Sequence, residues 1–193
     1  MSAGMGRWLE RGAIVLASLA VSVGVIALLS GGLAGGRDDP GISVSGGAVP
    51  GQAFPDQGDR HLAAGDRRPT YNSDPPTSGA HVPLPVTRNG AAISNDQLLQ
   101  ALSLGDVVFL YSSATPPGGL QAVANQVAPS FTPTLAADGQ TVILARRPNL
   151  STITALAWAH MLRSDSAEDL RTFATHWLGR GATSRTTSIV GNQ

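Results

Sequence analysis

Two of the four histidines, His61 and His81, are the residues best suited to metal chemistry. An imidazole nitrogen binds zinc or copper and can act as a base near neutral pH. Both histidines precede the first buried-strand pattern, in loop-like sequence that would have to bring them together. Two interpretations stay open: the pair holds copper or zinc, or His81 bonds to the backbone of its own loop while His61 lies exposed. For His160 and His176, in predicted regular elements, we expect a half-exposed structural role.

Asp74, Ser78 and His81 are the residue types of a serine hydrolase, which needs a nucleophile, a base and an acid that orients the base. Neighbours on one short loop rarely converge in this way, and the sequence has no Gly-x-Ser-x-Gly turn. No complete catalytic constellation is visible. We therefore expect a protein that is not an enzyme, with a hydrolase as an alternative.

These residues belong to one stretch, 71–81, that reads Tyr-Asn-Ser-Asp-Pro-Pro-Thr-Ser-Gly-Ala-His. The two prolines hold φ near about −65° and have no N–H, so no helix or central strand passes through. The following hydroxyls can bond to the backbone, and the glycine can take a positive φ. The stretch predicts a rigid loop, and its candidate functional residues are Tyr71, Asn72, Asp74, Pro75, Pro76, Thr77, Ser78, Gly79 and His81.

This stretch resembles the signature of an uncharacterised bacterial family, domain of unknown function 3105. Its members carry Pro-Pro-Thr-Ser-Gly-Pro-His behind a membrane-spanning N-terminus. The likeness extends from about His61 to about Gly181 and includes the apolar run Val107–Tyr111 and the segment Ala155–Trp158. The family has no known activity, so the resemblance implies architecture and location rather than a mechanism.

One departure from the family concerns metal ligands. Members usually carry Glu-His-Gly before the following strand, where this chain has Ser103, Leu104 and Gly105. If the family's histidines converge on a metal, this chain keeps His61 and His81 but lacks a third nitrogen ligand and a carboxylate. Two imidazoles fall short of a closed tetrahedral site, so the resemblance implies at most weak binding of copper or zinc.

Apolar periodicity predicts the elements that must position the loop. The predicted helices cover residues 95–102, 120–127 and 165–179, and the predicted strands cover 107–111, 141–145 and 152–162. Ser94 or Asn95 would cap the first helix, and Asp165 with Glu168 matches a capping box for the last. Pro129 and Pro133 would end the middle helix. The last strand also fits a helix by pattern, but its β-branched residues and the family resemblance favour a strand.

This succession predicts an α+β fold, in which helices pack on a small mixed β-sheet of three or four strands. The alternative is a thioredoxin-like fold, which ends with the same succession. Because the chain has no cysteine, that fold would have no redox cysteines.

Composition excludes several functions. The formal net charge is +0 and every basic residue is an arginine, so no basic patch indicates nucleic acid and no lysine is present for amine chemistry. The absence of cysteine excludes disulfides, thiol nucleophiles and thiolate metal sites. The 193 residues suit one domain with one core.

The N-terminal region predicts a membrane anchor. Residues 13–33 are almost wholly apolar and would reach about 31 Å as a helix, which matches the hydrocarbon thickness of a bilayer. Arg7 and Arg11 precede this span and Asp38 and Asp39 follow it, so residues 1–12 are expected in the cytoplasm and the remainder outside. A cleaved signal peptide is the alternative.

The remaining boundaries follow from composition. Residues 34–59 are rich in glycine, proline and serine and indicate a flexible linker, although Phe54 could pack on the domain as part of an N-terminal arm. Residues 60–180 form the outward-facing domain and 181–193 a disordered tail. We therefore expect a single-pass envelope protein that acts as a binding or structural module, with an envelope protein as a possible partner and no nucleic acid. A weak copper- or zinc-binding domain is the alternative.

Overall fold

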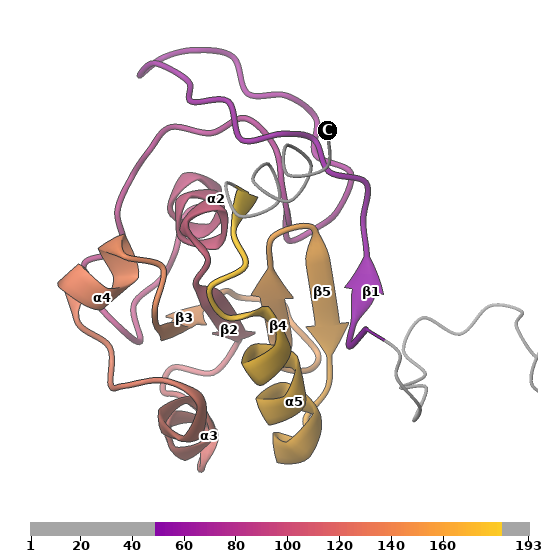
Figure 1. Ribbon diagram of the computed structural model, residues 1–193, viewed down its shortest axis with the longest axis vertical. Helices are drawn as coiled ribbons and strands as arrows, with labels where there is room; N and C mark the ends of the chain where they lie inside the picture. Colours follow the sequence, from indigo (N-terminus) through magenta and orange to yellow (C-terminus); the bar gives the residue numbers. More distant parts are fainter. Residues whose placement is uncertain (1–48, 183–193) are drawn as a thin grey trace, which may run out of the picture. The chain divides into compact units, whose positions relative to one another are not determined.

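The computed structural model describes residues 49–182 (Figure 1). The predicted membrane span, the first part of the predicted linker and nearly all of the predicted tail lie outside these residues. The elements of the described part are β1 Gln52–Ala53, α2 Asn95–Leu104, β2 Val107–Tyr111, α3 Leu120–Val127, α4 Pro133–Ala137, β3 Val142–Arg146, β4 Thr154–Ala157, β5 His160–Arg163 and α5 Ala167–Trp177. Within this part of the chain, no helix is long and apolar enough to cross a membrane.

The strands form one mixed sheet in the order β1-β5-β4-β2-β3. β2 and β3 run parallel, in a register that pairs Val107 with Val142 and Tyr111 with Arg146. The β2–β4, β4–β5 and β1–β5 pairs are antiparallel. All five residues of β2 are buried, which explains why its sequence is a continuous apolar run rather than an alternating one. The prediction of an α+β fold with a mixed sheet is confirmed, but the sheet has five strands rather than three or four.

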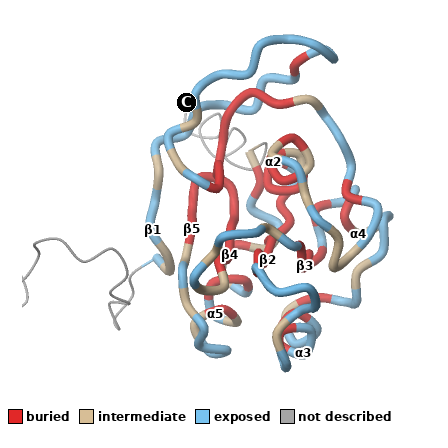
Figure 2. The backbone as a smooth tube through the Cα atoms, turned by 180° about the vertical axis from the view of Figure 1, so that it is seen from behind, coloured by how far each residue is buried: buried red, intermediate tan, exposed pale blue. Residues whose placement is uncertain are grey.

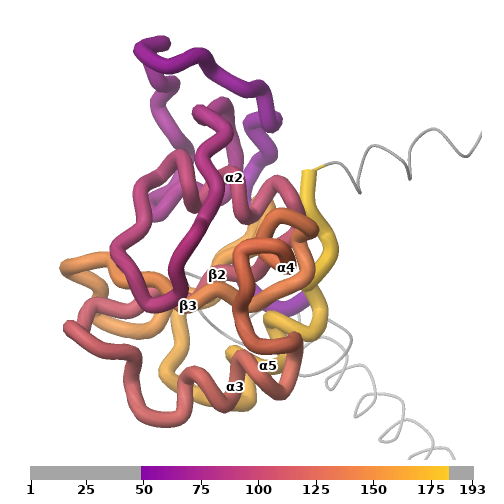
Figure 3. The backbone as a smooth tube through the Cα atoms, turned by 90° about the vertical axis from the view of Figure 1, so that its left-hand side faces the viewer, coloured from indigo at the N-terminus to yellow at the C-terminus, as the bar shows by residue number. Residues whose placement is uncertain are grey.

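Helices cover both faces of the sheet (Figures 1 and 3). Phe109 and Tyr111 of β2 point to the side of α3 and α5, where they meet Phe173 in one apolar cluster. Val108 and Leu110 point to the opposite side, where α2, α4 and Tyr71 of the 71–81 stretch pack. Figure 2 shows that the buried residues concentrate in the inner strands and in α2. The sheet therefore has a core on each face, and the 71–81 stretch lies on the α2 face.

The ends of α2 follow from its sequence. The Ser94 side chain accepts a hydrogen bond from Gln97 N, and the Gln97 side chain accepts one from Ser94 N, so both halves of a capping box are present. Gly105 ends the helix with φ 115°. The predictions of this helix, of β2 and of α3 are confirmed, while β3 begins one residue later than the predicted strand.

The N-cap of the last helix differs from the prediction. Ser166, not Asp165, caps α5 by accepting a hydrogen bond from Asp169 N. The Asp165 carboxylate instead accepts from Ile153 N at 3.0 Å and so ties the start of β4 to the turn before α5. A serine and an aspartate side by side can both cap a helix, and the tertiary bond to Ile153 decides between them.

Two further predictions are corrected by the structure. The single strand predicted for 152–162 is a hairpin, β4 and β5, whose turn places Ala159 at φ 59°. No glycine, asparagine or proline marks that turn, so it carries no local turn signal. Pro133, predicted to end a helix, begins one: it lies at the start of α4, and Thr132 accepts from Leu135 N as N-cap.

Residues 50–59 of the predicted flexible linker are part of the fold. Gln52 and Ala53 pair with Met161 and His160 at the edge of the sheet, and Phe54 packs against the core on the α2 face. The Asp56 carboxylate accepts a hydrogen bond from Trp158 Nε1 at 2.9 Å. The N-terminal arm left open as an alternative therefore describes this segment better than a linker.

The last two-thirds of the described chain run as helix, parallel β-α-β unit, antiparallel hairpin and final helix. This is the succession on which the thioredoxin-like alternative was based. That finer assignment stays a prediction.

Candidate functional site at the Pro-Pro loop

Residues 71–81, called here the motif loop, are held by the side chains of the motif itself. The Ser73 hydroxyl accepts from Thr77 N at 3.1 Å, and Asn72 donates its Nδ2 to Pro55 O at 2.7 Å. Ser78 Oγ accepts from Gln57 N at 3.0 Å. Thr77, Ser78 and His81 are each 0% exposed. The polar residues that make the motif specific are therefore largely used to fix its shape and to fasten it to residues 55–57.

Gly79 is required by a close approach within the loop. Its φ is 125°, and a Cβ at this position would lie 3.0 Å from ring carbons of Tyr71. The Tyr71 hydroxyl crosses the loop and donates to Ala80 O at 3.0 Å. Burial raises the pKa of Tyr71. Tyr71 therefore serves the loop as a neutral hydrogen-bond donor packed over the glycine.

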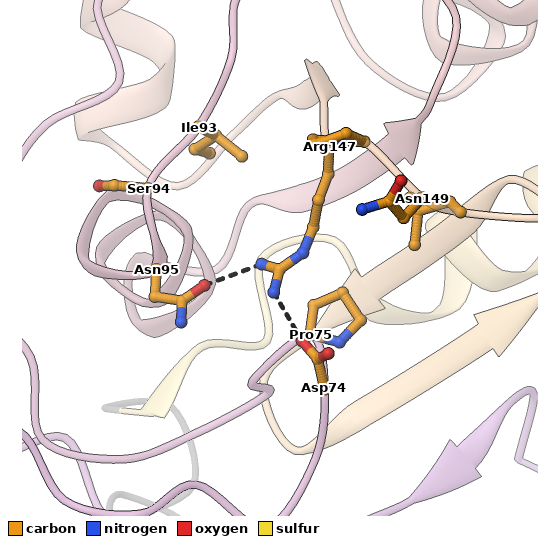
Figure 4. Close-up of a pocket in the computed structure, with 9 residues that line it drawn as sticks. Asp74, Pro75, Ile93, Ser94, Asn95, Arg147 and Asn149 are labelled. Atoms are coloured by element: carbon orange, nitrogen blue, oxygen red, sulfur yellow. Dashed lines mark hydrogen bonds and ion pairs between the residues drawn. The ribbon is translucent and has the colours of Figure 1, made fainter.

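Two arginines from the C-terminal half of the chain hold Asp74 and Pro75 in place. The peptide bond between Asp74 and Pro75 is cis. Arg147 donates from Nη2 to the Asp74 carboxylate at 2.5 Å and from Nη1 to Asn95 Oδ1 at 2.8 Å (Figure 4). Arg163 donates to Asp74 O at 2.9 Å. The side chain of Asp74 is 85% exposed and that of Arg147 22%. The Arg147 guanidinium is thus clamped between the motif loop and the start of α2.

An open cleft of about 460 Å³ lies beside this clamp, lined by residues 74–75, 93–95 and 147–150. Figure 4 shows the Arg147 guanidinium between Asp74 on one side and Asn95 on the other. A carboxylate and an amide oxygen hold the guanidinium, so the cleft offers fixed donors and acceptors to a ligand. We call it the motif-loop cleft.

The structure brings His61 and His81 together. The two residues pair through a parallel β-bridge, and their ring centroids are 5.5 Å apart in an edge-on arrangement. His81 is buried and its Nδ1 lies 2.9 Å from Gly79 O, whereas His61 is exposed. His81 Nε2 has no hydrogen-bond partner among the described residues. The backbone bond of His81 matches the structural interpretation, and Nε2 is the His81 nitrogen that a metal could use.

The described residues do not place further ligands beside this pair to complete a metal site. Within residues 49–182, no three or more His, Cys, Asp or Glu side chains are placed to hold a metal ion. Asp96, near the start of α2, accepts a hydrogen bond from Val82 N, the residue after His81. Asp96 therefore lies close to His81. Leu104 is eight residues further along that helix, about 12 Å at 1.5 Å per residue. Positions 103 and 104 therefore lie far along the helix from His81. This geometry does not support a metal site that joins positions 103 and 104 with His81.

Asp96 itself is a structural anchor. Arg68 forms an ion pair with it and, by hydrogen bonding, holds the pKa of Asp96 below its usual range. The same carboxylate receives Val82 N at 3.1 Å. It therefore fastens the end of the motif loop to α2.

The hydrolase residues do not converge. Ser78 Oγ bonds to Gln57 N and lies 3.4 Å from Pro55 O, and Asp74 pairs with Arg147. The ring of His81 bonds to Gly79 O. Each member of the trio has a different partner, so the loop does not form a relay from acid to base to nucleophile.

Several site residues were missed by sequence reasoning. Arg147 and Arg163 each follow an apolar run at the end of a strand. Trp158 lies in the turn between β4 and β5, and its indole N–H donates to Asp56. Asp106 directly precedes the buried β2 and is 1% exposed, with a pKa that burial raises to about 8. An acid wedged between a helix-ending glycine and a buried strand is the signal that could have found it.

The fold and the site define a small α+β domain built around a polar loop that two arginines and a buried histidine hold in place. The family described as Protein of unknown function (DUF3105) matches residues 63–185, and the chain belongs to this family. The resemblance of the motif loop to that family is thereby confirmed. No curated protein and no solved structure matches the chain.

Proposed function

We propose that this chain is a single-pass protein of the bacterial envelope whose DUF3105 domain lies outside the cytoplasm as a non-catalytic binding module. The charges around the apolar segment support the orientation, since Arg7 and Arg11 precede residues 13–33 and Asp38 and Asp39 follow them. The binding role rests on the motif-loop cleft, and the partner is a polypeptide segment of another envelope protein.

The observation that carries this proposal is the clamped guanidinium of Arg147. A guanidinium has five N–H donors, and Asp74 and Asn95 take one each. These partners already fix the direction of the Arg147 side chain. It therefore loses little conformational freedom when it binds a ligand carbonyl or carboxylate. The exposed Asp74 carboxylate supplies an acceptor for ligand N–H groups. Donor and acceptor side by side suit a peptide backbone, which carries both in each residue.

We expect a cysteine placed in the motif-loop cleft to crosslink to a partner protein. The chain has no cysteine, so Pro148→Cys creates a unique site at an exposed lining residue without loss of an N–H donor. A membrane-impermeant maleimide with a photoreactive arm is applied to intact spheroplasts. Labelling reports the outward orientation, and a discrete crosslinked band reports binding.

Two variants make this result specific. Gln126→Cys places the same label on an exposed face of α3, across the sheet from the cleft, and should be labelled without giving that band. Asp74→Ala releases one side of the Arg147 clamp and should weaken the band from Pro148→Cys several-fold. Unlabelled protein contradicts the orientation. A labelled protein with the same bands at positions 148 and 126 contradicts the binding role of the cleft.

A second candidate function is weak binding of copper or zinc by His61 and His81. The supporting observation is the His81 ring, whose Nδ1 lies within hydrogen-bonding distance of a carbonyl oxygen while Nε2 has no hydrogen-bond partner among the described residues. A metal-bound histidine commonly has this second-shell bond. With only two imidazoles, the remaining ligands would be water or exchangeable groups.

Titration of Cu(II) and Zn(II) should detect weak binding that His61→Ala abolishes. His61 is exposed, so its loss should leave the fold intact. His176→Ala, on α5 across the sheet, is the matched control and should bind metal as the parent protein does. Equal titration curves for the parent protein and His61→Ala would show that the pair holds no metal.

A further inference from the structure

A second cavity, of about 240 Å³, lies between the C-terminal half of α2, the segment 83–86 and α4. Its walls are mainly apolar and include Val86 and Ala136. Leu104 lines it and is 41% exposed, and Leu84, between two lining prolines, is 43% exposed. Apolar walls of this kind fit the alkyl part of a small ligand.

Asp106 lines this cavity from the start of β2. One carboxylate oxygen accepts from Thr141 N at 3.0 Å, and the other has no hydrogen-bond partner among the described residues. Burial raises the pKa of Asp106 to about 8, and the Thr141 N–H only partly opposes this. No other lining residue of the cavity is ionisable. The carboxyl group is therefore buried without a cation.

Gln100 lines the same cavity from α2, and its buried Oε1 also lacks a partner within the described chain. Buried acceptors in native proteins are nearly always paired. Two residues that line one small cavity thus each have an unpaired buried acceptor oxygen, which indicates that hydrogen-bond donors from outside the chain belong there. The donors must come with an apolar body, because the rest of the wall is apolar.

We propose that this cavity binds a small aliphatic primary amine in its ammonium form. The ammonium group has three N–H donors, enough for the free oxygen of Asp106 and for Gln100 Oε1. Its charge provides the cation that the buried carboxyl lacks. The volume corresponds to about eight waters at roughly 30 Å³ each, which suits a short alkyl chain. A neutral alcohol of the same shape would contact the apolar walls of the cavity but supply no charge.

Calorimetric titration of the full chain, purified in a neutral detergent, tests this with n-butylammonium. We expect saturable binding at pH 8, and n-butanol of the same length should give none. Because binding requires the ionised carboxyl, affinity should rise about tenfold from pH 6 to pH 7 and level off above about pH 8. Buffers of different ionisation enthalpy should report close to one proton released at pH 7.

Asp106→Asn is the matched variant, because the amide oxygen can still accept from Thr141 N while the charge is lost. Binding should disappear in it, although circular dichroism shows a folded protein. Arg147→Gln, in the motif-loop cleft, should bind butylammonium unchanged, so this result is independent of the peptide-binding proposal. Absence of saturable binding in the parent protein, equal binding of butanol, or full binding by Asp106→Asn would each overturn the proposal.

Discussion

Replacement of Asp106 by asparagine should stabilise the protein, and increasingly so as the pH rises from about 4 to about 8. The carboxyl is 1% exposed, has one hydrogen bond and touches no cation in the described chain. Its ionised form is therefore poorly solvated. Asparagine has a similar shape, can accept the same hydrogen bond from Thr141 N and never ionises.

The sign follows from proton binding. Burial raises the pKa of Asp106 in the folded protein to about 8, from an ordinary value of 3.8. Between these values the folded state keeps a proton that the unfolded chain has released, so the free energy of unfolding falls as the pH rises through this window. The fall is about 1.4 kcal/mol per pH unit, hence on the order of 4 kcal/mol between pH 4 and pH 7. Above about pH 8 both states are ionised and the loss is complete.

Urea unfolding of the parent protein and of Asp106→Asn at pH 5, 6, 7 and 8 measures this difference. The gap in free energy of unfolding should widen at each step. Thr175→Ala is the control, because it is exposed and changes no ionisable group, so its gap to the parent should change little over the same range. A gap for Asp106→Asn that does not depend on pH would show that the carboxyl is already ionised in the folded protein, and the prediction would be wrong.

The local elements could be read from the sequence because their signals are local. Ser94 and Gln97 are three residues apart, and the apolar runs of β2 and α3 need no knowledge of their partners. The hairpin β4–β5 was missed for the opposite reason. Its turn residue Ala159 takes a positive φ, and its N–H is held by Thr77 O at 2.9 Å. Tertiary contact with the motif loop thus stabilises a turn that local propensity does not favour.

The candidate site shows the same division. The motif loop was recognised as rigid from its prolines and Gly79, and His81 was rightly considered as a residue that bonds to its own loop. Arg147 and Arg163 could not be assigned to that loop, because 73 and 89 residues separate them from Asp74. Asp106 needed knowledge of burial. What was missed depends on long-range packing, which spacing along the chain does not encode.

The fixed position of residues 50–53 also depends on a long-range contact, which Trp177 makes. Trp177 is 6% exposed, stacks on His160 with ring centroids 3.7 Å apart and donates from Nε1 to Pro50 O at 2.9 Å. It therefore joins α5, β5 and the segment before β1. Trp177→Ala removes this aromatic side chain and leaves a cavity, so we expect a loss of about 3–5 kcal/mol in the free energy of unfolding.

Trp177→Phe separates packing from the hydrogen bond. Phenylalanine keeps most of the apolar contact but cannot donate to Pro50 O, so the global loss should fall to about 1 kcal/mol, while amide hydrogen exchange at Gln52 and Ala53 should accelerate. Thr175→Ala, at an exposed position of the same helix, should change neither quantity by much. Chemical denaturation followed by far-ultraviolet circular dichroism gives the first quantity, and exchange detected by mass spectrometry gives the second. If exchange at residues 52–53 stayed slow in Trp177→Phe, pairing with β5 alone would hold β1, and the role assigned to the Trp177 indole N–H would be wrong.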